Sequence, residues 1–201
     1  EPFAQHGFVN TPVYRGSTVL FPDLETLETG NQRYTYGRKG SPSMSALEEA
    51  LVHLEQGEAC FLAPSGLSAV TTALLAFVKA GDHMLVADTV YPPTRRFTSE
   101  VLTTFGVEVE FYDPLLGAGI EPRIKPNTRL IYAESPGSQT FEVQDLPAIA
   151  EAARKHGLFM LVDNTWATPL YLKPLTLGAD VVIHAATKYI VGHADANLGA
   201  I

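Results

Sequence analysis

The regular alternation of short apolar runs with longer segments of helical periodicity constrains this chain of 201 residues more than any other feature. Helical spacing is found over residues 41–57, 65–79, 94–105 and 146–157. The apolar, strand-sized runs are 59–63, 83–87, 107–112, 129–133, 158–162 and 181–183. Strands that alternate with helices of ten or more residues build a mostly parallel sheet that is covered by helices. The chain is therefore predicted to be an α/β protein.

Composition and charge exclude several classes of protein. Apolar residues make up 46% of the chain, which is too apolar for a disordered protein. The net charge of −8 argues against nucleic acid as a partner, because phosphate backbones are bound by clustered cations. No apolar stretch is long enough for a membrane span. The single cysteine, Cys60, excludes an internal disulfide framework and suits a reducing compartment. We therefore expect a cytoplasmic protein that binds neither membranes nor nucleic acids.

The first 40 residues differ in character from the rest. They show weak periodicity and many Gly and Pro residues, so we expect an extended arm over residues 1–40 and one domain over residues 41–201. Contact with a neighbouring subunit is our hypothesis for the arm. The chain lacks an initiator Met and stops at Ile201 inside a strand-like run, which suggests a segment of a longer protein.

In a parallel sheet the ligand sits beyond the carboxyl ends of the strands, so the residues after each strand are the candidates for a site. The run 59–63 is followed by Pro64, Ser65, Gly66 and Leu67, and then by a helix. A glycine turn that opens a helix places free backbone N–H groups and a positive dipole end together, which suits a phosphate. An ordinary turn between a strand and a helix has the same pattern, so this motif alone does not decide between them.

Two further strands are followed by groups that carry chemistry. The run 158–162 leads into Asp163, whose carboxylate needs a partner at the end of a buried strand. The run 181–183 leads towards Thr187 and Lys188. A lysine desolvated there would have a lowered pKa and would react with carbonyls. A phosphate anchor, an acid and a lysine are what pyridoxal phosphate needs for its phosphate, its ring nitrogen and its Schiff base.

Four motifs then resemble the Cys/Met-metabolism family of pyridoxal-phosphate enzymes. They are Tyr-Gly-Arg at 36–38, Glu-Ser-Pro-Gly-Ser at 134–138, Asp-Asn-Thr-Trp at 163–166 and Ala-Thr-Lys-Tyr-Ile-Val-Gly-His at 186–193. The resemblance covers nearly the whole chain and includes the spacing between the motifs. Within the family, Gly137, Ser138 and Trp166 are most similar to the bacterial cystathionine β-lyases. The γ-synthases and γ-lyases usually carry Thr-Asn and Phe or Tyr at the matching places.

The resemblance implies the fold and the catalytic residues. It implies a fold-type-I large domain with a mostly parallel seven-stranded sheet between helices, preceded by an extended N-terminal arm. Lys188 would hold pyridoxal 5'-phosphate as an internal aldimine and act as the general base. Asp163 would pair with the pyridine nitrogen, and Tyr91 would stack on the ring.

The resemblance also implies the remaining cofactor contacts. The backbone N–H groups of Gly66 and Leu67, with the hydroxyl of Thr187, would hold the phosphate. Tyr36 and Arg38 would reach the phosphate of a neighbouring subunit's cofactor, so that the arm completes a partner's site. The expected assembly is a homotetramer built as a dimer of dimers, and no metal is expected.

The activity that the resemblance implies is β-elimination of L-cystathionine, an amino-acid substrate of methionine biosynthesis, to homocysteine, pyruvate and ammonia. A cystathionine γ-lyase, a γ-synthase or a methionine γ-lyase is the alternative within the class. A catalytically incomplete fragment or a regulatory scaffold is the alternative outside it. The family's C-terminal domain supplies the arginine for the substrate carboxylate, and no residue of 1–201 is assigned that role.

Several residues are open to a second interpretation. Ala185 stands where the family often has a serine that contacts the phosphate. His184 and His193 match no zinc pattern, and Glu134 is interpreted as structural. Trp166 is as compatible with a substrate pocket as with packing beside the ring, because both environments are apolar.

Overall fold

Residues 6–201 are described by a computed structural model, and the chain forms two compact units. The first unit ends at His53 and the second runs from Leu54 to Ile201. The first unit contains α1 (Leu24–Thr29), the 3-10 helix η2 (Gly37–Lys39) and most of α2 (Pro42–Glu55). The boundary between the units therefore lies inside α2, beyond the end of the arm that the sequence suggested.

The first unit has little regular structure and many exposed apolar side chains. Helix α1 is closed at its start by Asp23, whose carboxylate accepts a hydrogen bond from Thr26 N at 2.7 Å. The Ser43 hydroxyl on α2 donates to Pro12 O at 2.9 Å. Val9 and Leu20 are more than four-fifths exposed. Such exposure is costly for a chain on its own.

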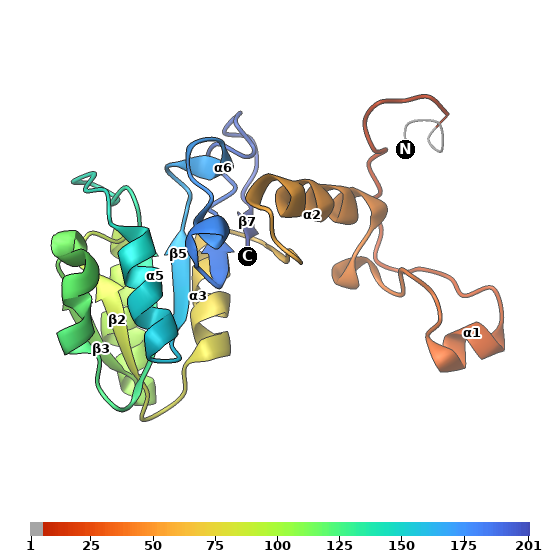
Figure 1. The fold of residues 1–201 in the computed structure, drawn as a ribbon. Helices are drawn as coiled ribbons and strands as arrows, with labels where there is room; N and C mark the ends of the chain where they lie inside the picture. Colours follow the sequence, from red (N-terminus) through yellow and green to blue (C-terminus); the bar gives the residue numbers. More distant parts are fainter. Residues whose placement is uncertain (1–5) are drawn as a thin grey trace. The chain divides into compact units, whose positions relative to one another are not determined.

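The second unit contains the sheet and its covering helices (Figure 1). Its strands are β1 (Leu62–Ala63), β2 (His83–Ala87), β3 (Glu108–Tyr112), β4 (Thr128–Glu134), β5 (Phe159–Asp163), β6 (Val181–Ile183) and β7 (Gly199–Ala200). Its helices are α3 (Gly66–Phe77), α4 (Pro92–Arg96), the π-helix η3 (Phe97–Val101), the 3-10 helices η4 (Leu102–Phe105), η5 (Pro114–Arg123) and η6 (Pro174–Leu177), α5 (Leu146–Lys155) and α6 (Thr168–Tyr171). The predicted α/β class is confirmed.

Five strands form one parallel sheet in the order β3-β2-β4-β5-β6. All five residues of β2 are buried, as are the central residues of β4 and β5, because helices cover both faces. Of the seven strands expected in one sheet, β1 and β7 instead pair with each other in a separate antiparallel ladder. A single antiparallel bridge between His184 and Ala200 links that ladder to the end of β6. β1 and β7 are only two residues long, which leaves too few pairing positions for a continuous ladder.

Local sequence explains where the main helices begin and end. Ser65 is the N-cap of α3, because its hydroxyl accepts a hydrogen bond from Ser68 N at 3.1 Å. Asp145 closes α5 in the same way through Ala148 N, and Gly157 follows α5 with a positive φ of 66°. None of the helices in the described part of the chain is long and apolar enough to cross a membrane.

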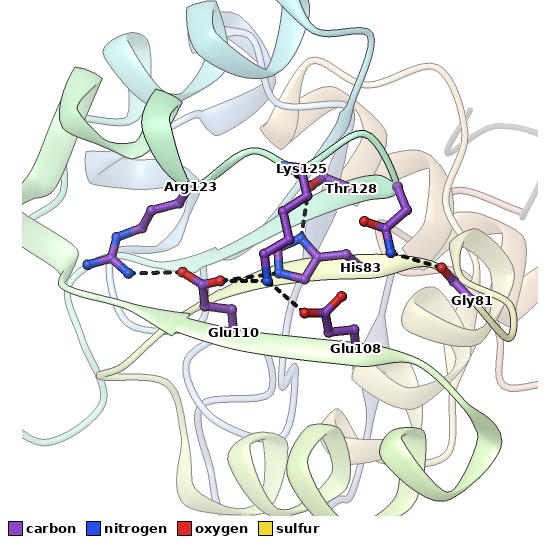
Figure 2. Close-up of polar contacts among 8 residues, drawn as sticks. Gly81, His83, Glu108, Glu110, Arg123, Lys125 and Thr128 are labelled. Atoms are coloured by element: carbon purple, nitrogen blue, oxygen red, sulfur yellow. Dashed lines mark hydrogen bonds and ion pairs between the residues drawn. The ribbon is translucent and has the colours of Figure 1, made fainter.

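A charged cluster closes the amino end of the sheet on its β3 side (Figure 2). Glu108 and Glu110 lie on edge strand β3 and both contact the Lys125 ammonium group, at 2.6 and 3.0 Å. Arg123 adds a second ion pair to Glu110 at 2.9 Å. At the centre His83 is fully buried, and its Nδ1 lies 2.8 Å from the Thr128 hydroxyl. These contacts tie β2, β3 and β4 together at the edge opposite to the carboxyl ends.

The surroundings of His83 favour the neutral imidazole. The Thr128 hydroxyl accepts a hydrogen bond from the backbone N–H of Lys125 at 2.7 Å, so its own proton is free to be donated to Nδ1 of a neutral ring. Burial is the main effect that lowers the pKa of His83, and the nearby charge of Lys125 lowers it further. The carboxylates of Glu108 and Glu110 act in the opposite direction but do not outweigh these two effects.

We predict that His83 makes folding pH-dependent. The unfolded chain takes up a proton at this ring below about pH 6.5, and the folded chain does so only at a lower pH. The His83 contribution is therefore complete above that pH and is lost as the pH falls. Urea unfolding between pH 7.5 and 5.5 should show a shallower loss of stability in His83→Asn than in the wild type. Exposed His53→Asn is the control, and an unchanged slope in His83→Asn would contradict the prediction.

Candidate active site at the carboxyl edge of the sheet

Two carboxylates end neighbouring strands at the centre of the sheet. Glu134 is the last residue of β4 and Asp163 is the last residue of β5, and the two are paired in register. Both are nearly buried, with 7% and 5% of their surfaces exposed. Parallel strands place their carboxyl ends on one edge, so this pairing follows directly from the topology. Two buried acids side by side favour a shared proton or a bound cation.

Asp163 is held in place by the residue two positions further along the chain. Its Oδ1 accepts hydrogen bonds from Thr165 N at 3.0 Å and from the Thr165 hydroxyl at 2.5 Å. The same hydroxyl oxygen accepts the Ala185 N–H at 2.8 Å. Burial raises the pKa of Asp163, while the two hydrogen bonds from Thr165 lower it. Thr165 therefore fixes the acid and joins it to the loop that follows β6.

Glu134 is connected to the predicted ring-stacking tyrosine. Its Oε2 accepts the Tyr91 N–H at 2.7 Å. Tyr91 directly precedes α4, and nearly half of its surface is exposed. Burial raises the pKa of Glu134 to about 8, and the charge of Asp163 contributes to the rise. Glu134 thus links the end of β4 to the residue before α4, and its interpretation as structural stays a prediction.

Lys188 lies in the turn that follows β6. Its backbone N–H donates to Ala185 O at 2.9 Å, and its carbonyl accepts the Gly192 N–H at 2.8 Å. Its side chain is exposed, which differs from the desolvated lysine that the sequence suggested. The apolar neighbour Ala186 is itself fully buried, and Lys188 lies two residues further on, in the turn closed by these hydrogen bonds.

The start of α3 approaches the same loop. A Cβ built on Gly66 would lie 2.4 Å from Ala185 Cβ, a distance at which no side chain fits. Gly66 and Leu67 occupy the first turn of the helix, where backbone N–H groups have no partner within the helix. Ala185 thus contacts both the start of α3 and, through Thr165, the acid Asp163. Ala185, the residue that departs from the family motif, therefore joins the start of α3 and the segment of Asp163 to the loop that carries Lys188.

Thr187 uses its hydroxyl within the chain. The hydroxyl accepts the Leu198 N–H at 2.8 Å and lies 3.1 Å from Leu198 O, while Thr187 N donates to that carbonyl at 2.9 Å. One acceptor position of the hydroxyl remains, but a phosphate needs a donor. The Thr187 contact to a phosphate therefore stays a prediction that requires this hydroxyl to change its partner. Tyr36 and Arg38 belong to the first unit, and their role at a neighbouring subunit also stays a prediction.

Trp166 is part of an aromatic row beside Lys188. Its ring centroid lies 5.3 Å from that of Phe141 and 5.8 Å from that of Tyr189. All three rings are about half exposed, so Trp166 is not a core residue within the second unit. The row leaves an exposed apolar surface on the segments that follow β4, β5 and β6.

Sequence reasoning missed the polar groups behind Asp163. His184 contacts Glu55 at 2.6 Å, and Asn164 contacts the same carboxylate at 2.8 Å. Only their positions could have marked them, because His184 directly follows the predicted strand 181–183 and Asn164 lies two residues after the predicted strand 158–162. Within residues 6–201, no three potential metal ligands come together.

These residues fit pyridoxal phosphate. Asp163 is a buried acid that uses Oδ1 for both hydrogen bonds from Thr165, so Oδ2 can accept a bond from a protonated ring nitrogen. The first turn of α3 offers N–H groups to a phosphate, and Lys188 offers an exposed amine.

We predict that Glu134 lowers the stability of the cofactor-free protein as the pH rises. The folded chain holds the proton of Glu134 up to about pH 8, whereas the unfolded chain releases it above about pH 4.5. The folded state therefore binds more protons across this window, and stability falls with rising pH. Glu134→Gln keeps an acceptor for Tyr91 N but cannot ionise. Its free energy of unfolding should exceed that of the wild type at pH 8 and match it near pH 5, and an equal difference at both values would contradict the prediction.

The geometry agrees with what the chain resembles. The sequence signature of the Cys/Met metabolism PLP-dependent enzymes matches residues 1–201. A relative in Rhizobium johnstonii is 53% identical over the whole chain, which covers 51% of that relative. The cystathionine beta-lyase MetC of Escherichia coli is 42% identical over 96% of this chain and 51% of its own length.

A solved structure shows the same fold. The crystal structure of cystathionine gamma-lyase from Lactobacillus plantarum, complexed with L-serine, superposes with a TM-score of 0.91 at 37% identity. The match covers 98% of this chain and 50% of that one. The chain thus spans about half the length of the proteins it matches. It belongs to the Cys/Met-metabolism family of PLP-dependent enzymes.

Proposed function

We propose that the complete protein is a carbon–sulfur lyase that cleaves L-cystathionine by β-elimination to homocysteine, pyruvate and ammonia. The observation that carries this proposal is the buried Asp163, held by Thr165 beside the loop that carries Lys188. Among its relatives, the 42% identity to the cystathionine beta-lyase of Escherichia coli supports β-elimination.

Each predicted site residue has a distinct task. Pyridoxal phosphate, when bound, supplies an electron sink for the charge that forms when an amino acid loses its α-proton. Asp163 would keep a positive charge on the ring nitrogen and so strengthen that sink. The N–H groups of Gly66 and Leu67 would orient the phosphate, and Tyr91 would cover one face of the ring.

Lys188 would anchor the cofactor and then move protons. Its exposed amine is accessible to an aldehyde and to a substrate amine. Once the substrate has displaced it, Lys188 Nζ would take the proton from the substrate Cα and return it to the departing sulfur. The aromatic row of Phe141, Trp166 and Tyr189 would exclude water from one side of the entrance.

The second candidate function is γ-elimination by the same site residues and cofactor, as in a cystathionine γ-lyase, a γ-synthase or a methionine γ-lyase. The structural match to the gamma-lyase of Lactobacillus plantarum supports it. The keto-acid product separates the two, because β-elimination gives pyruvate and γ-elimination gives 2-oxobutyrate.

The assembly that we propose is a homotetramer in which each site is shared between subunits. The exposed apolar side chains of the first unit, among them Val9, Leu20 and Leu24, support burial against another chain. Tyr36 and Arg38 would then reach the phosphate of the neighbouring cofactor. A half-length product that binds the cofactor without turnover is the alternative.

The test is product formation by the full-length protein and by Lys188→Ala. The wild type should convert L-cystathionine to pyruvate, while Lys188→Ala should lose at least about a thousandfold in kcat, because it removes both the anchor and the base. Lys79→Ala, which removes an exposed lysine after α3, should behave as the wild type. Formation of 2-oxobutyrate as the main product would contradict β-elimination, and normal turnover by Lys188→Ala would contradict the site.

A further inference from the structure

The backbone of Tyr91 is held on both sides. Tyr91 precedes Pro92, and a residue before proline is restricted to extended or polyproline-like backbone, as its φ of −45° and ψ of 129° show. Its carbonyl oxygen accepts the Arg95 N–H at 3.0 Å. Its own N–H donates to Glu134 Oε2 at 2.7 Å. These three constraints together fix the backbone from which the tyrosine ring projects.

Glu134 is itself held by buried groups of two other segments. Its backbone carbonyl accepts a hydrogen bond from Gln144 Nε2 at 2.8 Å, and Gln144 Oε1 accepts the Tyr112 hydroxyl at 2.8 Å. The backbone N–H of Gln144 donates to the Ser135 hydroxyl at 2.9 Å. Tyr112, Ser135 and Gln144 are all buried. The end of β4 is therefore anchored to β3 through Gln144, and the Glu134 side chain starts from a fixed position.

The loop after β4 also packs directly on the residues before Tyr91. The Ser138 N–H donates to Thr89 O at 2.8 Å. A Cβ built on Gly137 would lie 2.7 Å from the Thr89 side chain, so the two segments approach as closely as a glycine allows. These contacts do not involve the Glu134 side chain and remain when it is replaced. A substitution of Glu134 therefore acts on Tyr91 without separating the two segments.

Packing alone does not account for a carboxyl group at this position. Glu134 is buried and stands in register with Asp163, which is buried as well. A buried carboxyl group costs free energy in either protonation form unless its oxygens are hydrogen-bonded, and a neighbouring acid disfavours its ionised form. An apolar side chain would avoid both costs but would leave the Tyr91 N–H without this acceptor. The acceptor for Tyr91 is thus what Glu134 supplies.

We propose that Glu134 is a positioning residue that fixes Tyr91 so that its ring stacks on the ring of the cofactor. The Tyr91 side chain is 45% exposed, so the ring is accessible to a ligand while the backbone is held. The energy of an aromatic pair depends on the distance and angle between the rings, and therefore on where the backbone places the side chain. The inference rests on the proposed stacking role of Tyr91, and it goes beyond the structural role predicted for Glu134.

The test is a double-mutant cycle on the full-length protein with pyridoxal phosphate as the ligand. Dissociation constants are measured by quenching of protein fluorescence, and the induced circular dichroism of the bound cofactor reports how its ring is oriented. Glu134→Leu removes the acceptor and keeps most of the volume. It should weaken binding about fivefold, the range expected when a stacked ring loses its fixed position, and it should diminish the dichroism band.

Tyr91→Ala supplies the second background, because it removes the ring and keeps the backbone N–H. In that background Glu134→Leu should cause no further loss of affinity, since no ring is left to be positioned. An effect of charge on the cofactor, or a general loosening of the sheet, would persist there. Glu134→Gln keeps an acceptor for Tyr91 N, so its effect should be the same with and without the ring. Glu110→Leu is the matched control, because it removes a partly buried acid from edge strand β3, away from the site, and should leave the affinity unchanged.

The outcomes distinguish this inference from the proposed function. An equal loss of affinity for Glu134→Leu in both Tyr91 backgrounds would overturn the inference and leave Glu134 a purely structural role. If Tyr91→Ala binds the cofactor as tightly as the wild type, the stacking role of Tyr91 is contradicted and the inference falls with it. If Glu134→Leu does not fold, Glu134→Asp decides, because it withdraws the acceptor from Tyr91 N by one methylene group: its loss of affinity must be confined to the protein that has the ring.

Discussion

The buried carboxylate of Asp163 is the constraint on which the rest of this site depends. It stands at the end of a strand covered on both faces, beside a second buried acid, and burial disfavours its charge. Hydrogen bonds from Thr165 stabilise the carboxylate, and Thr165 also holds the loop after β6 in place. The start of α3 then packs on that loop so closely that only glycine fits at position 66. The acid, the helix start and the lysine loop are thus one connected arrangement.

The two edges of the sheet treat charge in opposite ways. At the amino edge, Glu108 and Glu110 are neutralised by Lys125 and Arg123, so this cluster is complete without any ligand. At the carboxyl edge, the paired acids retain raised pKa values. A cation bound there would stabilise the ionised form of both acids. The amino edge thus holds balanced ion pairs, whereas the carboxyl edge holds acids that a bound cationic ring would neutralise.

The sequence predicted the elements whose pattern is local and missed the contacts that join distant segments. The strands 83–87 and 181–183 agree with the structure, because continuous apolar runs bounded by Gly and polar residues define buried strands. Asp163 and the start of α3 became candidates because each comes close after an apolar, strand-sized run in the sequence. The exposure of Lys188 and the separate pairing of β1 with β7 depend on tertiary geometry. The Glu55–His184 pair was missed because no periodicity connects the end of α2 to the end of β6.

The central claim is that Lys188 lies within reach of a cofactor held by Asp163 and the first turn of α3. The most direct measurement is the visible absorption of the purified protein with pyridoxal phosphate, followed by borohydride reduction and mass mapping of the peptides. We expect a yellow protein whose reduced cofactor is attached to Lys188. A protein that stays colourless, or a label on another lysine, would contradict it.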